Sequence, residues 1–252
     1  MGADPPEAMS LRGKRALVTG AAVRVGRAIA LGLAAAGADV AVHYNASAEA
    51  ARETCGAVRA FGVRCVLVQA DQATEGAPER LVAEAAAGLG GLDLLVLSAA
   101  GFERAPALEL DRARFEAMIA TNLTGPFLIA RAAQPHLKAS RGAIVSLVDI
   151  CGTSQVWKGY AHYAAAKAGL AALTRLLALE WAPEIRVNGV APGTVLAPDA
   201  TTADAHARLV RRIPLGHAGD PADAARAVLF LLAQPFITGQ ILAVDGGRSV
   251  DP

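Results

Sequence analysis

Short, mainly apolar runs alternate along the chain with longer stretches in which apolar residues recur at helical spacing. The runs predict strands and the longer stretches predict helices. After the first run, for example, Val25, Ile29 and Leu33 fall on one face of a helix that Gly37 ends. The predicted strands are 15–19, 39–43, 64–69, 92–97, 143–148, 185–190 and 240–244. The predicted helices are 24–36, 48–61, 76–89, 111–137, 160–182, 203–212 and 222–232.

The predicted strands are nearly continuous apolar runs and do not alternate with polar residues, which is typical of a parallel sheet whose two faces are covered by helices. Because strands and helices alternate, the sequence predicts a single α/β domain with a doubly wound parallel sheet, the Rossmann fold. Residues 1–10 are expected to form a disordered lead and 11–252 the folded domain. A bend is expected near Gly125 and Pro126. Ligands of such sheets bind at the carboxyl ends of the strands.

Composition and charge exclude several classes of protein. Hydrophobic residues make up 54% of the chain and charged residues 19%, which permits a large core. A formal net charge of +1 gives no basic excess for binding nucleic acid. No apolar run reaches the ~18 residues of a membrane helix. The first residues also lack the basic flank and apolar stretch of a signal peptide.

The cysteines give no sign of a stabilising framework. Cys55, Cys65 and Cys151 are odd in number and lack the paired spacing of metal ligands. Neither a disulfide framework nor a zinc site is therefore expected, and a reducing cytoplasm is the default location. The histidines also lack metal-ligand spacing, so no metal is predicted.

The turn after the first strand has the layout of a pyrophosphate site. Gly20 permits a tight turn, Gly26 permits close packing of helix on strand, and the helix start offers free backbone N–H groups. An ordinary turn that contains two glycines is the alternative. Arg24 stands between the glycines, where its guanidinium could reach a phosphate or an anionic edge of a substrate, or simply lie in solvent.

The end of the second strand indicates which dinucleotide binds. An acidic residue there would hold the ribose 2′-hydroxyl of NAD, but residues 42–47 contain no carboxylate. His43 and Ser47 can both donate hydrogen bonds to a 2′-phosphate, which favours NADP, unless His43 only terminates the strand. After the third strand, Asp71 either accepts the adenine amino group or caps the next helix.

Tyr163 and Lys167 have the i, i+4 spacing that places two side chains on one helical face. A nearby ammonium favours the phenolate, so Lys167 is expected to lower the pKa of Tyr163, unless the two form an ordinary surface pair. Asp149 follows the fifth strand, where it either holds or passes a proton or caps the next segment. The three residues predict proton transfer to or from a carbonyl or imine.

These motifs in this order resemble the short-chain dehydrogenase/reductases: the glycine turn, a polar residue after the fifth strand, YxxxK and a final Val-Asp-Gly-Gly. The resemblance spans 11–250 and implies NADPH as cofactor, a small-molecule substrate and a homotetramer. It also implies that Asn122 holds a water in the proton relay. The implied catalytic residues are Tyr163, Lys167, Asp149 and Asn122. The implied cofactor-binding residues are Gly20, Arg24, Val25, Gly26, His43, Tyr44, Asn45, Ser47, Asp71, Gln72, Ser98, Ala99, Lys167, Pro192, Gly193 and Thr194.

Within that family the chain is most similar to bacterial and protozoal pteridine reductases. Arg24 replaces the usual glycine, Asp149 stands where most relatives have a catalytic serine, and Phe102 aligns with the phenylalanine that stacks a pterin. The implied substrate-binding residues are Arg24, Phe102, Asp149 and Tyr163. The segment from Asp149 to Tyr163 is one residue longer than in the family, and the extra residue is expected in the loop 151–158. The alternative match, Ile150, has no proton to give.

The resemblance implies NADPH-dependent reduction of a pterin-type C=N bond by hydride transfer, with a proton relay through tyrosine, lysine and aspartate. Two alternatives stand beside it. The first is a carbonyl reductase similar to the 3-oxoacyl-[acyl-carrier-protein] reductases. The second is a non-catalytic NADP-binding sensor, although a sensor has no need of an intact proton relay.

Overall fold

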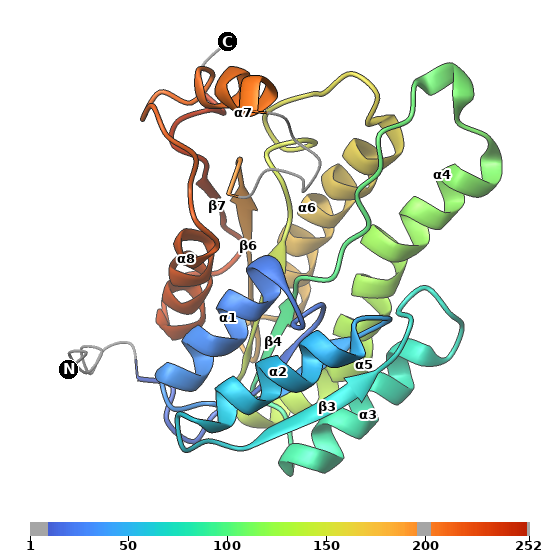
Figure 1. The fold of residues 1–252 in the computed structure, drawn as a ribbon. Coiled ribbons are helices and arrows are strands. Elements are labelled where there is room, and N and C mark those ends of the chain that lie inside the picture. The colour runs from blue at the N-terminus through green and yellow to red at the C-terminus, as the bar shows by residue number, and fades with distance from the viewer. Residues whose placement is uncertain (1–9, 196–202, 251–252) are drawn as a thin grey trace.

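Seven parallel strands form one sheet at the centre of the computed structural model, which describes residues 10–195 and 203–250 (Figure 1). The strands are β1 (Arg15–Val18), β2 (Asp39–Tyr44), β3 (Cys65–Gln69), β4 (Leu94–Leu97), β5 (Ala143–Leu147), β6 (Arg186–Pro192) and β7 (Ile241–Val244). Their order across the sheet is β3-β2-β1-β4-β5-β6-β7. This confirms the predicted doubly wound parallel sheet. The order reverses between β1 and β4, which opens a crevice at their carboxyl ends.

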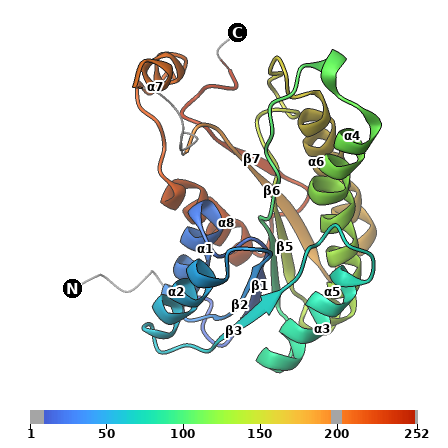
Figure 2. The same ribbon diagram turned by 45° about the vertical axis from the view of Figure 1, so that its right-hand side comes forward.

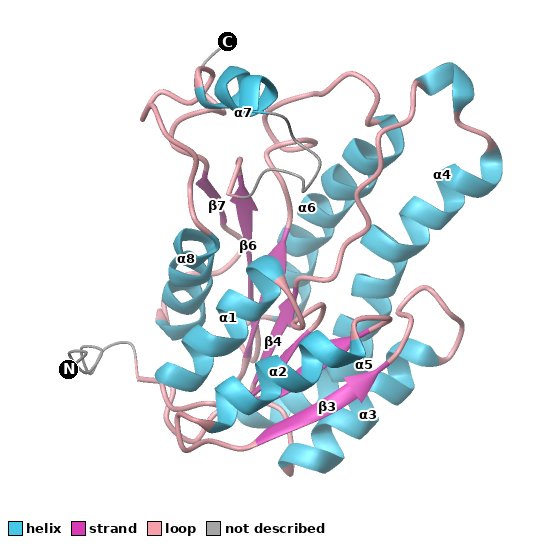
Figure 3. Ribbon diagram, viewed as in Figure 1, coloured by secondary structure: helices cyan, strands magenta, loops and turns pink. Residues whose placement is uncertain are grey.

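Helices cover both faces of the sheet (Figure 2). One face carries α1 (Arg24–Ala35), α2 (Ala48–Arg59) and α8 (Pro221–Ala233). The other carries α3 (Ala77–Leu89), α5 (Gly125–Ser140) and α6 (Ala161–Trp181). Beyond the sheet lie a short 3₁₀ turn (Ala107–Glu109), α4 (Arg112–Ile119) and α7 (Ala203–Val210). Figure 3 shows α7 above β6 and β7. Each face has its own apolar core, so the strands are apolar on both sides.

The helix predicted over 111–137 is interrupted close to the expected bend. α4 ends at Ile119, a wider π-helical turn spans Ala120–Thr124, and α5 begins at Gly125. Such turns occur frequently at functional sites. A Cβ on Gly125 would lie 2.7 Å from the backbone oxygen of Gln72, so only glycine permits this approach of the helix to the loop after β3.

Cys55 and Cys65 form a disulfide in the structure, which corrects the expectation that the cysteines are unpaired. Cys55 lies on α2 and Cys65 begins β3, and the packing of helix against strand brings their Cα atoms to 5.7 Å. That distance suits a disulfide. The number of cysteines could not show this pairing, because it depends on how two separate elements pack. Cys151 is free and buried.

No helix within residues 10–195 and 203–250 is long and apolar enough to cross a bilayer. The disordered lead predicted for residues 1–10 lies outside the described residues except for Ser10, which is exposed.

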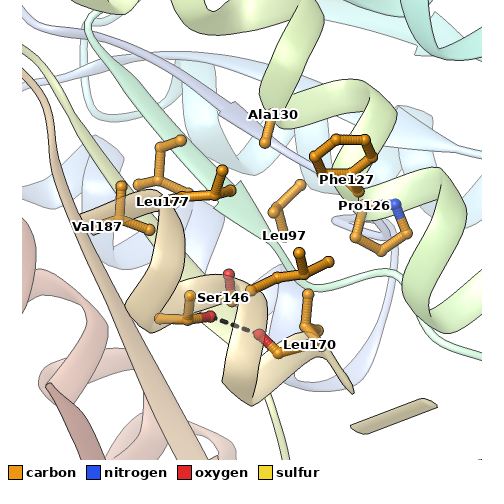
Figure 4. Close-up of a pocket in the computed structure, with 11 residues that line it drawn as sticks. Leu97, Pro126, Phe127, Ala130, Ser146, Leu170, Leu177 and Val187 are labelled. Carbon is orange, nitrogen blue, oxygen red and sulfur yellow. Dashed lines mark hydrogen bonds between the residues drawn. The ribbon is translucent and has the colours of Figure 1, made fainter. Parts of the chain in front are cut away.

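A small cavity lies between the sheet and helices α5 and α6 (Figure 4). It measures about 10 Å³ and is lined mainly by apolar side chains such as Leu97, Phe127 and Leu177. A cavity of this size holds about one water molecule at most. It is a packing defect of the core, and the functional site must lie elsewhere.

Candidate active site

A cleft of about 1070 Å³ lies at the carboxyl ends of the strands. Its walls come from the turns after β1 to β6, from the start of α6, and from residues after α7 and β7. Every residue predicted for the site lines this one cleft, with the exception of Asn122. These residues are Gly20, Arg24, Val25, Gly26, His43, Tyr44, Asn45, Ser47, Asp71, Gln72, Ser98, Ala99, Phe102, Asp149, Tyr163, Lys167, Pro192, Gly193 and Thr194.

The glycine turn after β1 has no room for side chains. A Cβ on Gly26 would lie 2.1 Å from the backbone oxygen of Gly20, and a Cβ on Gly20 would lie 2.7 Å from the Cα of Ala99. α1 begins at this turn, and the side chain of its N-cap residue, Val23, accepts no hydrogen bond. The first backbone N–H groups of the helix therefore have no side-chain cap. A pyrophosphate fits here, because these N–H groups and the helix dipole both favour an anion.

Arg24 adopts a backbone conformation that glycine normally occupies. Its φ is +54°, in the left-handed region, which costs about 1–2 kcal/mol for a residue with a Cβ. Strain of this kind persists mainly at functional sites. The guanidinium belongs to the cleft lining, so the strained turn holds a positive charge beside the proposed phosphate position.

His43 does not have the free donor that a phosphate contact requires. The ring is 2% exposed; Nδ1 accepts the backbone N–H of Gly20 at 3.1 Å, and Nε2 donates to the oxygen of Ala70 at 3.0 Å. Burial lowers the pKa of His43, so the ring is neutral and both nitrogens are used internally. His43 therefore braces the glycine turn against β3, and the expected direct contact with a 2′-phosphate is corrected.

Neighbouring polar groups also fix the loops that line the cleft. One carboxylate oxygen of Asp71 accepts the Ala73 N–H at 2.9 Å in the turn before α3, whose N-cap is Gly76, so Asp71 does not cap that helix. The Gln72 amide donates to the backbone oxygen of Thr121 at 2.7 Å. The hydroxyl of Thr19 accepts the backbone N–H groups of both Ser98 and Ala99, at 2.9 and 3.0 Å. Thr19 was not among the predicted site residues, although its position directly before Gly20 indicates that it belongs to the glycine turn.

Tyr163, Asp149 and Lys167 meet in the centre of the cleft. The Tyr163 hydroxyl donates to Asp149 Oδ2 at 2.7 Å, and the other carboxylate oxygen accepts the Cys151 N–H at 2.8 Å. Lys167 Nζ donates to the backbone oxygen of Leu147 at 2.8 Å and lies 5.7 Å from the centre of the Tyr163 ring. Asp149, and not Ile150, therefore contacts Tyr163.

The charges of this cluster differ from the sequence expectation. Burial, followed by the negative charge of Asp149, raises the pKa of Tyr163 well above its ordinary value. Burial also raises the pKa of Asp149 and lowers that of Lys167 to about 8. The expectation that Lys167 lowers the pKa of the phenol is therefore wrong for this structure, because burial and then the Asp149 carboxylate, which accepts the hydrogen bond of the hydroxyl, raise it. Tyr163 holds its proton and can act as an acid.

Asn122 lies behind the cleft wall, in the π-helical turn before α5. It is fully buried, and its amide nitrogen donates to the backbone oxygen of Met118 at 3.1 Å. Its side-chain oxygen has no partner among the described residues. A buried acceptor of this kind is a suitable place for a water molecule. The role of Asn122 in a proton relay remains a prediction.

Aromatic side chains form a wall beside the Tyr163 hydroxyl. Phe102 stacks on Tyr160 at 4.8 Å between ring centres and meets Tyr163 edge-on at 4.9 Å. Trp157 meets Tyr160 edge-on at 5.9 Å. Phe102 was predicted to contact substrate, whereas Trp157 and Tyr160 were missed. The indication for them was the presence of two large aromatic residues in the loop directly before α6. We call Phe102, Trp157 and Tyr160 the aromatic wall.

Comparisons with known proteins show the family of this chain. The family described as enoyl-(acyl carrier protein) reductase matches residues 20–249. The chain is 41% identical over 242 residues to cis-4-hydroxycyclohexanecarboxylate dehydrogenase of Sinomonas cyclohexanicum, covering 92% of this chain and 95% of the relative. It is 36% identical over 240 residues to 3-oxoacyl-[acyl-carrier-protein] reductase FabG of Staphylococcus aureus, covering 93% and 97%. A short chain dehydrogenase from Burkholderia cenocepacia, solved in complex with NADP, has a TM-score of 0.89 at 37% identity and covers 94% of this chain and 98% of that one. The chain belongs to the short-chain dehydrogenase/reductase family.

Proposed function

We propose that this oxidoreductase uses NADPH to reduce a C=N bond in a flat, pterin-like ring. One observation carries the proposal: the Tyr163 hydroxyl and the Asp149 carboxylate are 2.7 Å apart at the edge of the aromatic wall. A flat ring can stack on that wall. A carboxyl group with a raised pKa can also hold and donate a proton, which suits protonation of a ring nitrogen.

The bound cofactor supplies a hydride, and the residues of this chain supply the proton. Tyr163 keeps its proton at neutral pH and donates it to the ring nitrogen while the neighbouring carbon is reduced. Asp149 returns a proton to Tyr163 and regains its own from water. One hydride and one proton are added across the double bond, which leaves CH–NH. Lys167 keeps a positive charge below the pair, where it offsets negative charge that develops during the transfer.

The end of β2 favours NADP over NAD. Tyr44, Asn45 and Ser47 line the cleft there without an acidic side chain, and the Ser47 hydroxyl makes no capping hydrogen bond with α2. Arg24, in the glycine turn, adds a positive charge to the lining of the same cleft. The related Burkholderia cenocepacia structure is a complex with NADP. These observations support a 2′-phosphate site made by Ser47, its neighbours and Arg24.

Ser47→Asp is expected to weaken NADPH binding by about 10–100-fold relative to NADH. The new carboxylate would repel a 2′-phosphate and accept a hydrogen bond from a ribose 2′-hydroxyl, together a charge-assisted effect of about 1.5–3 kcal/mol. Titration calorimetry with both cofactors measures the ratio of their dissociation constants. Ser47→Ala is the matched control for loss of the hydroxyl alone. A ratio unchanged by the aspartate would place the phosphate elsewhere.

Interconversion of a ketone and a secondary alcohol is the second candidate. The names of the two relatives given above describe enzymes that act on such groups. One acts on a hydroxycyclohexanecarboxylate and the other on a 3-oxoacyl group carried by acyl-carrier-protein. The proton of Tyr163 would serve a carbonyl oxygen in the same position as a ring nitrogen. Both reactions add one hydride and one proton, so what distinguishes the two candidates is Asp149, which stands where the family resemblance implies a serine in most relatives.

The test is NADPH oxidation by the purified protein with dihydrobiopterin, 4-oxocyclohexanecarboxylate and an acetoacetyl thioester in parallel. Turnover of the pterin, abolished in Asp149→Ser, is the expected result. Turnover of only the ketones, retained in Asp149→Ser, would establish the second candidate. Tight NADPH binding without turnover of any of the three would instead favour a non-catalytic NADP-binding sensor.

A homotetramer remains part of the proposal. Leu176 and Leu179 on α6 are 47% and 79% exposed, and Phe115 on α4 is 39% exposed. Apolar side chains grouped on two neighbouring helices suit contact with a second subunit. Light scattering of the purified protein is expected to give four times the chain mass, and Leu179→Arg is expected to lower it. A monomeric mass for the unaltered protein would contradict the assembly.

A further inference from the structure

A buried arginine lies in the cleft, and the chemistry above does not use it. Arg248 follows β7 and is only 6% exposed. Its guanidinium lies 5.0 Å from the centre of the Trp157 ring, and Nη1 donates a hydrogen bond to Thr194 Oγ1 at 2.6 Å. Together with Asp149 and Tyr163, Arg248 lines the cleft. Because it is buried and lines the cleft, the guanidinium borders the space in which a substrate would bind.

The charge of Arg248 has no ion-pair partner among the described residues, and its Nε is buried without a hydrogen bond. Asp245, on the same turn, accepts the backbone N–H groups of Gly247 and Ser249 at 3.0 and 2.6 Å. Burial lowers the pKa of Arg248, as does the positive charge of Arg212, which also lines the cleft, and the attraction of Asp149 and Asp245 offsets this only in part. A buried cation is costly unless something supplies a counter-charge. An anionic ligand would do so.

The aromatic wall connects this arginine to the reacting pair. The ring of Trp157 lies beside the Arg248 guanidinium and meets the Tyr160 ring edge-on. Tyr160 stacks on Phe102, which in turn meets Tyr163 edge-on. A ring that lies along the wall is therefore within reach of both the proton donor and the guanidinium, whose positive charge also acts on Asp149.

We infer that the substrate carries a carboxylate, and that Arg248, assisted by Arg212, binds it. A guanidinium presents a rigid fork of N–H donors that matches the two oxygens of a carboxylate. A planar anion with one charge also fits a single buried guanidinium beside an aromatic ring. The inference rests on the proposed function, because it assigns a further residue of the same site. It adds that the flat ring bears an acidic side group that meets Arg248.

Calorimetry on the NADP⁺-loaded protein tests this with ligands that differ only in charge. The first pair is pterin-6-carboxylate and pterin-6-carboxamide, and the second is 4-oxocyclohexanecarboxylate and its carboxamide. The expected result is that the acid of at least one pair binds about 10–100-fold more tightly than its amide, as one charge-assisted contact provides. Arg248→Met should remove that preference while leaving amide binding unchanged, and Arg248→Lys should retain part of it. Arg211→Met is the matched control, because Arg211 is exposed and lies outside the cleft lining.

Several results would overturn the inference. These are equal binding of acid and amide by the unaltered protein, no binding of either acid, or an equal loss of acid and amide in Arg248→Met. A fall in NADP⁺ affinity with no change for the acids would assign Arg248 to the cofactor instead. If Arg248→Met does not fold, the acid and amide comparison in the unaltered protein and in the exposed variant Arg212→Met decides. Acid preference without turnover would contradict only the proposed reaction, whereas pterin turnover without acid preference would contradict only this inference.

Discussion

Asp149→Asn is expected to lower kcat for NADPH-dependent reduction by about 10²–10⁴-fold, the usual contribution of a positioned acid. The amide keeps the size of the carboxyl group but has no acidic proton, and its nitrogen cannot accept the Tyr163 hydroxyl proton. Initial rates at saturating substrate and neutral pH measure the effect. The affinity for NADPH is the internal control and should not change, because Asp149 contacts Tyr163 and the Cys151 N–H rather than the glycine turn.

The pH profile sharpens this test. Burial raises the pKa of Asp149, while hydrogen bonds from Cys151 and Tyr163 and the charge of Lys167 oppose the rise. Only the protonated carboxyl group can pass on a proton, so kcat of the unaltered protein should fall as the pH rises through that raised pKa. Asp149→Asn should lack this limb of the profile. A variant with the same kcat and the same limb would remove Asp149 from the proton relay.

Lys167→Met is expected to abolish turnover and yet make the folded state more stable at neutral pH. Lys167 is 3% exposed, and burial lowers its pKa from 10.5 to about 8, against the opposing attraction of Asp149. At about 1.36 kcal/mol per pKa unit, the charged form costs roughly 3 kcal/mol of folding free energy. Loss of the hydrogen bond to Leu147 returns about 1 kcal/mol of that. A net gain of about 2 kcal/mol is expected from denaturant unfolding.

The gain should depend on pH in a defined direction. Below about pH 8 Lys167 is charged in both states, so the full cost applies. As the pH rises from about 8 to 10.5, the unfolded state binds a proton that the folded state does not, and the unaltered protein gains stability. The advantage of Lys167→Met should therefore shrink across that window. Lys138→Met is the matched control, since Lys138 is a 58% exposed residue on α5. A gain that is constant with pH would show that the lysine charge is not its source.

The strand and helix pattern was predictable because the inner strands are buried on both faces and the helices on one. The cleft was predictable for the same reason: parallel strands bring the residues that follow them to one edge of the sheet. Nineteen residues could therefore be assigned to one site before their side-chain directions were known. The sequence therefore predicts where these residues lie, but it does not predict which group each polar atom bonds.

Side-chain partners were the part that sequence could not supply. His43 was expected to face a phosphate, but the backbone N–H of Gly20 and the oxygen of Ala70 occupy its two nitrogens. The pKa of Tyr163 was expected to fall, but the aspartate is nearer to its hydroxyl than the ammonium is. The Cys55–Cys65 disulfide likewise depends on the packing of α2 against β3. In each case a contact between separate elements decides, and a local pattern does not contain it.

The position of Trp157 gives the protein a built-in optical reporter. The chain has two tryptophans, and Trp181 lies at the end of α6 that is remote from Tyr163. Trp157 lies in the cleft lining, where its ring faces a guanidinium and its indole nitrogen is buried without a partner. Its emission therefore responds to whatever enters the cleft, whereas Trp181 contributes a constant background. Occupancy can be followed by intrinsic fluorescence without a label, and a Trp157→Phe protein serves as the blank.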